Sequence, residues 1–429
     1  MQVPTPSLSV PFKRAVLAAV IATIGCGAWA AEDGASPYYI GASQAVIHDS
    51  NVYRVPDAQR IPDYYSSTGV LAGLDQMISR QRVYASANVN YNKFHNEDAL
   101  DNTSYALKAG WDWATIEKLS GTFSGTANRS LASRDGNANI PVSKRNIANT
   151  DQVAASIRWG GEGLLTLEGN YGHSRVRYSA PEYITEKSSG DTASAGIFYR
   201  LGPTVRLGLA GRFTHTEAPY AIPTVAAPTG PDDYQAEKSN GRNVDLTVDW
   251  RYSTQTNVNA RLSWTRQTFS GVQERNFSGL TGAVYANYAP TGKLTFNASF
   301  VRDAGINPTF FNVVGTPSTA PNIGLSENSE VVNTTGIGVR YAATAKITAN
   351  AKYQYRHAKV VNTVGVAGAT TTSEETDNLR IASLGVTYDI SRAWQLSCDV
   401  AHEKRDISGA SGFTFSANMA GCAVQFVYR

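Results

Sequence analysis

Long apolar runs are missing from the sequence after its first thirty residues, which excludes a protein that crosses a membrane with helices. Methionine and cysteine are scarce, with 3 of each among 429 residues. Glycine and tyrosine are abundant instead, with 37 and 22 residues, and the mean hydropathy is −0.27. A cytosolic enzyme of this length normally contains more methionine and more helix-forming residues. The composition therefore favours a chain of many strands and turns.

The first thirty residues have the three parts of an export signal. Lys13 and Arg14 supply a positive region, and residues 15–24 form a short apolar core. The small residues Ala28 and Ala30 then supply a cleavage site, and a polar stretch follows them. This pattern indicates a protein that leaves the cytoplasm.

We therefore predict a signal peptide over residues 1–30, a short periplasmic segment over 31–37 and one domain over 38–429. A lipoprotein signal anchored at Cys26 stays open as an alternative. Removal of the signal peptide, which carries two positive charges, brings the formal net charge from +3 to about +1. A nearly neutral mature chain gives no support to nucleic-acid binding.

Apolar and polar residues alternate with a period of two throughout the predicted domain. Residues 105–113 and 244–252 are the clearest segments, and 153–159, 205–213 and 258–264 repeat the pattern. Successive side chains of a strand point to opposite faces, so each segment has one apolar and one polar face. These segments run about 10 to 14 residues, the length that crosses a bilayer at a tilt.

Short and long connections take turns between these segments. The short ones lie around residues 79–81, 117–118, 160–163, 202–203, 253–255, 290–292, 343–344 and 391–392. The long polar ones cover 48–66, 95–102, 132–150, 178–189, 216–240, 304–329 and 361–377. Short periplasmic turns and long outer loops are the layout of a bacterial outer-membrane barrel. We predict an all-β, single-chain antiparallel transmembrane barrel of about 18 strands, with 16 as the alternative.

The polar face of each predicted strand supplies the candidate functional residues, because it would line the lumen. Its cations are Lys108, Arg158, Arg200, Arg206, Arg212, Arg251, Arg261, Arg340, Lys352 and Arg356. Its anions include Asp112, Glu168, Asp245 and Asp249. A barrel of about 18 strands is wide enough for an aqueous channel unless loops plug it. The cationic excess favours an anionic solute or polymer, whereas pairing between neighbouring strands would leave a neutral wall.

Two cysteines remain once the predicted signal peptide is removed. Cys398 and Cys422 fall on the last two predicted strands, about equidistant from the turn between them. A disulfide in the oxidising periplasm and two thiols on the lipid face are both open. Neither cysteine has a histidine beside it in the pattern, so we expect no metal site. We expect no cofactor either.

Catalysis has no recognisable machinery in the sequence, and we expect no enzyme. The histidines fall near the outer ends of predicted strands, and no Gly-x-Ser-x-Gly motif accompanies them. The same ends carry the cations Lys93, Arg129, Arg175, Arg177, Arg212, Arg266, Arg302, Lys359, Lys404 and Arg405. Such a basic rim suits contacts with outer-membrane lipid and the phosphates of lipopolysaccharide. Ordinary solvated charges at the loop bases are the alternative.

Several short motifs accompany the barrel pattern. They are HDSNVYR at residues 48–54, SRQR at 79–82, and LDNTSY at 100–105 leading to WDW at 111–113, together with the late cysteine pair. In these motifs the chain resembles the outer-membrane barrel family of proteobacterial exopolysaccharide biosynthesis operons, which often accompany exosortase sorting systems. The resemblance covers nearly the whole mature chain. It implies export or assembly of a secreted polysaccharide, and the residues Asp49, Asn51 and Arg54 read as a loop-packing motif.

The sequence therefore predicts a passive conduit for a secreted exopolysaccharide, working with periplasmic export components. Two alternatives stay open. One is a general or sugar-specific diffusion porin. The other is a plugged barrel that serves as an assembly or anchoring component of a polysaccharide export system.

Overall fold

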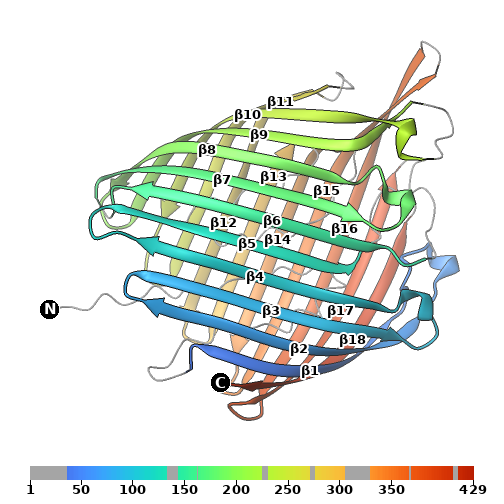
Figure 1. The fold of residues 1–429 in the computed structure, drawn as a ribbon, viewed down its shortest axis with the longest axis horizontal. Coiled ribbons are helices and arrows are strands. Elements are labelled where there is room, and N and C mark those ends of the chain that lie inside the picture. The colour runs from blue at the N-terminus through green and yellow to red at the C-terminus, as the bar shows by residue number, and fades with distance from the viewer. Residues whose placement is uncertain are drawn as a thin grey trace.

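The alternating segments form strands of one antiparallel sheet in the computed structural model of the chain (Figure 1). The structure describes residues 36–132, 144–161, 163–224, 230–270, 276–304, 329–366, 369–408 and 414–429. The signal peptide predicted over residues 1–30, with Cys26, lies outside these ranges and stays a prediction. The first strand begins at Tyr38.

The sheet contains the 18 strands that the alternation predicts. The first nine are β1 (Tyr38–Asp49), β2 (Asp63–Ile78), β3 (Gln81–Phe94), β4 (Asn102–Ala114), β5 (Leu119–Leu131), β6 (Ile147–Trp159), β7 (Leu165–Tyr178), β8 (Ser188–Leu201) and β9 (Val205–Pro223). The other nine are β10 (Tyr234–Trp250), β11 (Thr256–Phe269), β12 (Phe277–Thr291), β13 (Leu294–Ala304), β14 (Ser329–Ala342), β15 (Ile347–Val366), β16 (Ala369–Asp389), β17 (Trp394–Ser408) and β18 (Phe415–Tyr428).

Helix is confined to single turns in the described part of the chain. These turns are η1 (Asp57–Gln59), η2 (Asp98–Leu100), η3 (Pro181–Tyr183) and η4 (Pro231–Asp233). No helix among the described residues is long and apolar enough to span a membrane.

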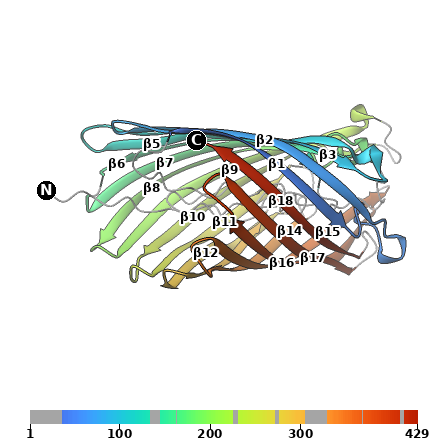
Figure 2. The ribbon, with the colours of Figure 1, turned by 90° about the horizontal axis from the view of Figure 1, so that it is seen from below.

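The first and last strands close the sheet into a barrel. Each strand pairs with its sequence neighbours, and β1 also pairs with β18, in a register that sets Ile40 opposite Tyr428 and Asp49 opposite Met419. Figure 2 shows β1 and β18 side by side at this seam. Closure gives every strand two partners, so no sheet edge is left with unpaired backbone groups.

The alternation separates an apolar outer face from a polar inner face. On β10, Val244 and Leu246 are 57% and 49% exposed, whereas the alternating residues Asp245 and Thr247 are buried. Large apolar side chains are exposed in the same way on strands all around the barrel. An apolar outer wall on a closed antiparallel sheet is what hydrocarbon requires of strands. The chain is an outer-membrane β-barrel.

The connections fall at two different ends. The tight turns lie at one end together with the start of β1 and the end of β18, and the longer connections with their 3-10 turns lie at the other (Figure 1). Short turns mark the periplasmic side. The predicted bounds of two loops were wrong. Most of 361–377 belongs to the paired strands β15 and β16, and much of 216–240 belongs to β9 and β10. Their polar residues pair as strands that extend beyond the apolar band.

A small apolar cluster covers the inner side of the seam. Ala45 and Ile47 of β1 pack with Met419 and Ala423 of β18. Ile381 of β16 packs against the same cluster. Residues from strands that are not neighbours meet there, so burial of apolar surface adds to the hydrogen bonds that close the barrel.

A disulfide joins the last two strands. Cys398 of β17 lies directly opposite Cys422 of β18, with a Cα–Cα distance of 4.1 Å and a bond between the two sulfur atoms. Both residues alternate with inward-facing neighbours and so lie on the outer face, in line with the exposed Val400. The structure thus contains the disulfide, which is one of the two alternatives that the sequence left open.

Reduction of this disulfide is expected to lower the free energy of unfolding by about 3 kcal/mol. The bond closes a loop with a sequence separation of 24 residues, and losing it enlarges the entropy of the unfolded chain. Urea unfolding of the barrel in micelles, with and without reductant, measures the difference. The double variant Cys398→Ser/Cys422→Ser should match the reduced protein and ignore reductant. Equal stability of oxidised and reduced protein would contradict this prediction.

Candidate functional site

Ion pairs that skip a strand identify the inner wall of the barrel. Arg206 of β9 pairs with Glu168 of β7, although β8 lies between these two strands. Side chains two strands apart approach each other on the concave side of a curved sheet, because the convex side spreads them. Residues in phase with Arg206 and Glu168 therefore point into the barrel.

The predicted lumen residues alternate with exposed apolar side chains and share this inward face. They are Lys108, Asp112, Arg158, Glu168, Arg200, Arg206, Arg212, Asp245, Asp249, Arg261, Arg340, Lys352 and Arg356. Arg251 follows the last residue of β10 and lies in the turn at the periplasmic end. The inward wall thus carries charges on most of its circumference.

Four of these charges form one network near the periplasmic end. The Glu168 carboxylate accepts a hydrogen bond from Arg158 at 2.6 Å and another from Arg206. Arg206 also lies 3.5 Å from Asp249, and its guanidinium stacks over the Phe198 ring. Glu168 is 4% exposed, and its two arginine partners offset the loss of hydration.

A second pair lies further along the same wall. Arg212 of β9 donates two hydrogen bonds to the Asp245 carboxylate, at 2.7 and 3.1 Å. Arg261 of β11 lies 3.8 Å from the same carboxylate. All three side chains are buried, so Asp245 is enclosed between cations on both neighbouring strands.

A third network joins β15, β16 and β17 near their outer ends. Asp377 accepts hydrogen bonds from Arg356 at 2.9 Å and from Arg405 at 3.1 Å. Both arginines are 1% exposed. The prediction that Arg405 belongs to an outer basic rim was wrong, because it lies inside the barrel. Arg212 faces inward as well and is also no part of the outer rim.

Four predicted lumen cations have no such partner. In the described part of the chain, no carboxylate forms an ion pair with Lys108, Arg200, Arg251 or Arg340, although Lys108 lies over the Tyr84 ring. Arg200, Arg251 and Arg340 lie within three residues of tight turns. Three of these four cations are therefore near the periplasmic end, where the inward-facing Asp389 of β16 also lies, whereas Lys108 lies midway along β4.

The connection between β1 and β2 packs into the outer mouth. Asn51 is fully buried and forms hydrogen bonds through its side chain to the backbone of Val55, at 2.7 and 3.1 Å, and to the Ser416 carbonyl at 3.2 Å. Tyr53 and Val55 pack against Phe94 of β3. The segment from Asn51 to Pro62 thus contacts inner-wall residues on either side of β1 and β2.

Arg54 fixes this segment to the wall from within. Its guanidinium donates hydrogen bonds of 2.7 Å to Asp49 of β1 and 2.7 Å to Glu403 of β17, and its backbone has the unusual φ of 51°. Burial alone would lower the pKa of Arg54, but the two carboxylates outweigh it and hold the pKa above its ordinary value. A left-handed backbone stays populated in a non-glycine residue only when such contacts over-determine it.

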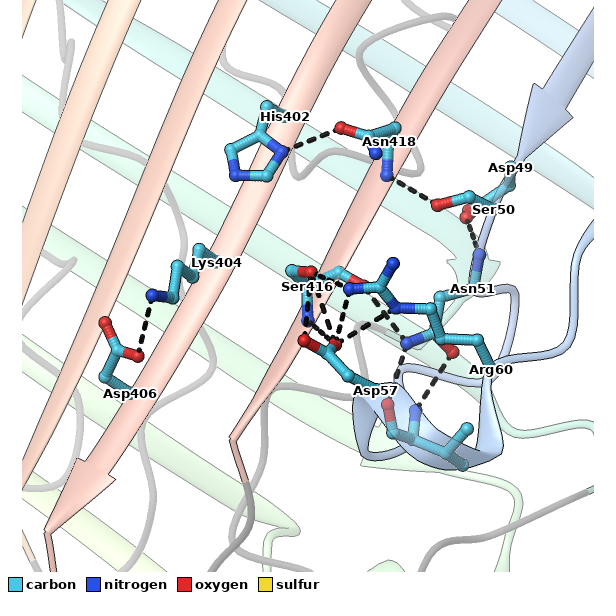
Figure 3. A network of polar contacts seen from close by, with 11 residues as sticks. Asp49, Ser50, Asn51, Asp57, Arg60, His402, Lys404, Asp406, Ser416 and Asn418 are labelled. Carbon is cyan, nitrogen blue, oxygen red and sulfur yellow. Dashed lines mark hydrogen bonds and ion pairs between the residues drawn. The ribbon is translucent and has the colours of Figure 1, made fainter.

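The rim end of the segment has a more exposed contact (Figure 3). The Asp57 carboxylate accepts hydrogen bonds from Arg60 at 3.1 Å and from the Ser416 amide at 2.8 Å. The Arg60 hydrogen bond and the Ser416 amide hold the pKa of Asp57 below its usual range. Asp49, Asn51 and Arg54 therefore act in the packing of this segment, as the sequence motif indicates.

Four of the six histidines form cross-strand contacts that the sequence did not reveal. Their Nδ1 atoms lie 2.7–3.0 Å from a side-chain oxygen on the next strand, in the pairs His173–Asp191, His215–Asn240, His357–Asn378 and His402–Asn418. All four pairs share the outer face, beyond the apolar band and toward the loops. Only the strand register brings these partners together. Within the described ranges, no group of His, Cys, Asp and Glu could hold a metal ion.

Replacement of Arg54 by alanine is expected to release the segment and to lower the free energy of unfolding by about 3–5 kcal/mol. The change leaves two buried carboxylates, Asp49 and Glu403, without their cation. Limited proteolysis of the 51–62 segment and urea unfolding measure the two effects. Arg60→Ala, in the same segment but at its exposed contact, is the matched control and should change little. Equal proteolysis and equal stability of the two variants would contradict the role of Arg54 in holding the 51–62 segment against the inner wall.

Several outer-membrane proteins of known structure are similar in fold. The outer membrane protein OpdK from Pseudomonas aeruginosa is 11% identical, with a TM-score of 0.44 over 91% of this chain and 99% of that one. OpdO from Pseudomonas aeruginosa is 10% identical, with a TM-score of 0.45 over 91% and 96%. The siderophore receptor PirA from Acinetobacter baumannii is 9% identical, with a TM-score of 0.41 over 91% and 80%. No family model matches the chain, and no curated protein matches it either. These likenesses concern the barrel architecture alone.

Proposed function

We propose that the protein is a passive outer-membrane conduit for a secreted exopolysaccharide and that the polymer it favours is acidic. The observation that carries the preference is the distribution of inward charge. Among the described residues, much of the inner wall is ion-paired, and three of the four lumen cations without a carboxylate partner, Arg200, Arg251 and Arg340, lie near the periplasmic turns. A polymer released from synthesis would meet that end first.

The ion-paired part of the inner wall favours passage of a polymer over its tight binding. In ion pairs such as Arg212–Asp245 and Arg356–Asp377, a buried carboxylate engages the arginine and weakens its attraction for a polyanion. Conduction requires binding that is favourable enough to admit a solute and weak enough to release it. A cationic entrance followed by a largely ion-paired, hydrogen-bonding wall meets both requirements.

The inner wall formed by the described residues does not by itself drive movement in one direction. The polymer would be pushed by its synthesis at the inner membrane, and periplasmic export components would deliver it to the barrel. The barrel size fits this role, because closed sheets of 16–18 strands are wide enough to enclose an aqueous channel.

A gated or plugged barrel is the second candidate, and the packed β1–β2 connection favours it. Arg54 holds that connection against the inner wall through buried contacts on two strands. A barrel of this kind would conduct only after the connection is displaced, for example by an export partner. A diffusion porin remains an outcome of the test below.

Single-channel recording in a planar bilayer is expected to give an open level that favours anions and is blocked by acidic polysaccharide fragments from the periplasmic side. Arg200→Gln/Arg251→Gln should weaken that block about tenfold, because two exposed charge contacts together contribute about 1.4 kcal/mol. The matched control is Arg129→Gln/Arg175→Gln, which removes two outward-facing charges and should leave the block unchanged.

Three other outcomes of the recording would favour a different function or mechanism. A large open level that no fragment blocks would replace the polysaccharide conduit by a diffusion porin. A closed barrel that opens in Arg54→Ala would support the gated barrel. A block that is equally strong in both double variants would overturn the role of the periplasmic arginines.

A further inference from the structure

Outward-facing arginines near the loops are paired with carboxylates on two sides of the barrel. Arg177 of β7 forms a 2.7 Å ion pair with Asp151 of β6. Arg380 of β16 forms a 2.6 Å ion pair with Asp406 of β17. At these two places a protein carboxylate neutralises the arginine, so no anion from the membrane is required.

Two arginines on β10 and β11 differ from these pairs because they face each other directly. Arg242 lies directly opposite Arg266 in the strand register, and both side chains are exposed on the outer face. Among the described residues, no carboxylate pairs with either guanidinium. Like charges directly opposed across a sheet are destabilising. The juxtaposition is thus unfavourable unless an external anion lies between the two guanidinium groups.

The neighbours of this pair change in character along the barrel axis. On the membrane side, Val244 lies opposite Trp264, and both are more than half exposed. On the loop side, the backbone carbonyl of Asn240 accepts a hydrogen bond from the Thr268 hydroxyl, and the Asn240 side-chain oxygen lies 2.8 Å from His215 Nδ1. An apolar surface, a double cation and a row of uncharged hydrogen-bonding groups therefore follow one another within a few residues.

We propose that Arg242 and Arg266 bind a phosphate group of a phosphorylated glycolipid in the outer leaflet. Guanidinium forks form charge-assisted hydrogen bonds with phosphate oxygens, and two of them can share one phosphate. The acyl chains of the lipid lie along Val244 and Trp264, where an exposed indole suits the membrane interface. Its sugar hydroxyls meet Asn240 and His215. The site lies on the outer wall, so it stands apart from the proposed passage of polymer through the lumen.

The test measures lipid binding to the intact barrel after delipidation in a nonionic detergent. Native mass spectrometry and thermal unfolding are recorded with a bis-phosphorylated glycolipid, with the same glycolipid lacking its phosphates, and with phosphatidylglycerol. Arg242→Gln/Arg266→Gln is compared with Arg177→Gln/Arg380→Gln, which removes two outward arginines that already have protein partners. Each single variant is included, so that one misfolded double variant does not decide the result.

We expect the wild-type protein and the control variant Arg177→Gln/Arg380→Gln to bind the phosphorylated glycolipid at least about tenfold more tightly than Arg242→Gln/Arg266→Gln does. The glycolipid should raise the Tm of the wild type and have a much smaller effect on the variant. Without lipid, loss of either arginine should leave the Tm unchanged or higher, because it removes the repulsion. Equal binding by the variant, or equal binding of the phosphate-free glycolipid, would overturn the site. Equal binding of phosphatidylglycerol would overturn the glycolipid as its ligand.

Discussion

The need of every backbone amide for a hydrogen-bond partner inside hydrocarbon is the constraint on which the rest of the structure depends. A strand that crosses a bilayer has no water to satisfy its free edge, so the sheet must close. The ladder between β1 and β18 performs this closure over ten residue pairs, from Ile40–Tyr428 to Asp49–Met419. Because closure fixes which face of each strand points inward, it also sorts the charged side chains into an inner wall and an outer rim.

The two charged surfaces then follow different rules. Inside, side chains such as Arg356 and Asp377 lose most of their contact with water, and pairing offsets the desolvation that each would suffer alone. Outside, near the loops, charges meet lipid headgroups, and an unpaired cation can find its partner in the membrane. Cations without a carboxylate partner, such as Arg200 and Arg340 inside and Arg242 and Arg266 outside, are therefore positions at which an anionic ligand can add favourable contacts.

The fold was predictable because a period of two is a local property. The alternation around Trp111 and Trp113 identifies a strand and its two faces without any knowledge of its neighbours, and 18 strands follow from repeating that reasoning. The long pairing of β15 with β16 was missed because its threonine-rich part, around residue 371, continues beyond the apolar band and reads as a loop. Contacts between distant segments were out of reach as well. Arg54 meets Glu403 at a sequence separation of 349 residues, and only the closed register brings them together. The prediction for Arg405 was wrong because it used the position of the residue along the strand and ignored the face of the sheet to which the side chain points.

Closure between β1 and β18 is the claim to test most directly, by cross-linking in the folded protein. In a Cys398→Ser/Cys422→Ser background, Ala45→Cys is combined with Ala423→Cys, its partner in the register, or with Ala417→Cys, roughly 20 Å further along β18. Oxidation or a short bifunctional thiol reagent should join the first pair efficiently and leave the second unjoined. Failure of the first pair to cross-link in a folded barrel, or equal cross-linking of both pairs, would contradict the closed 18-stranded register.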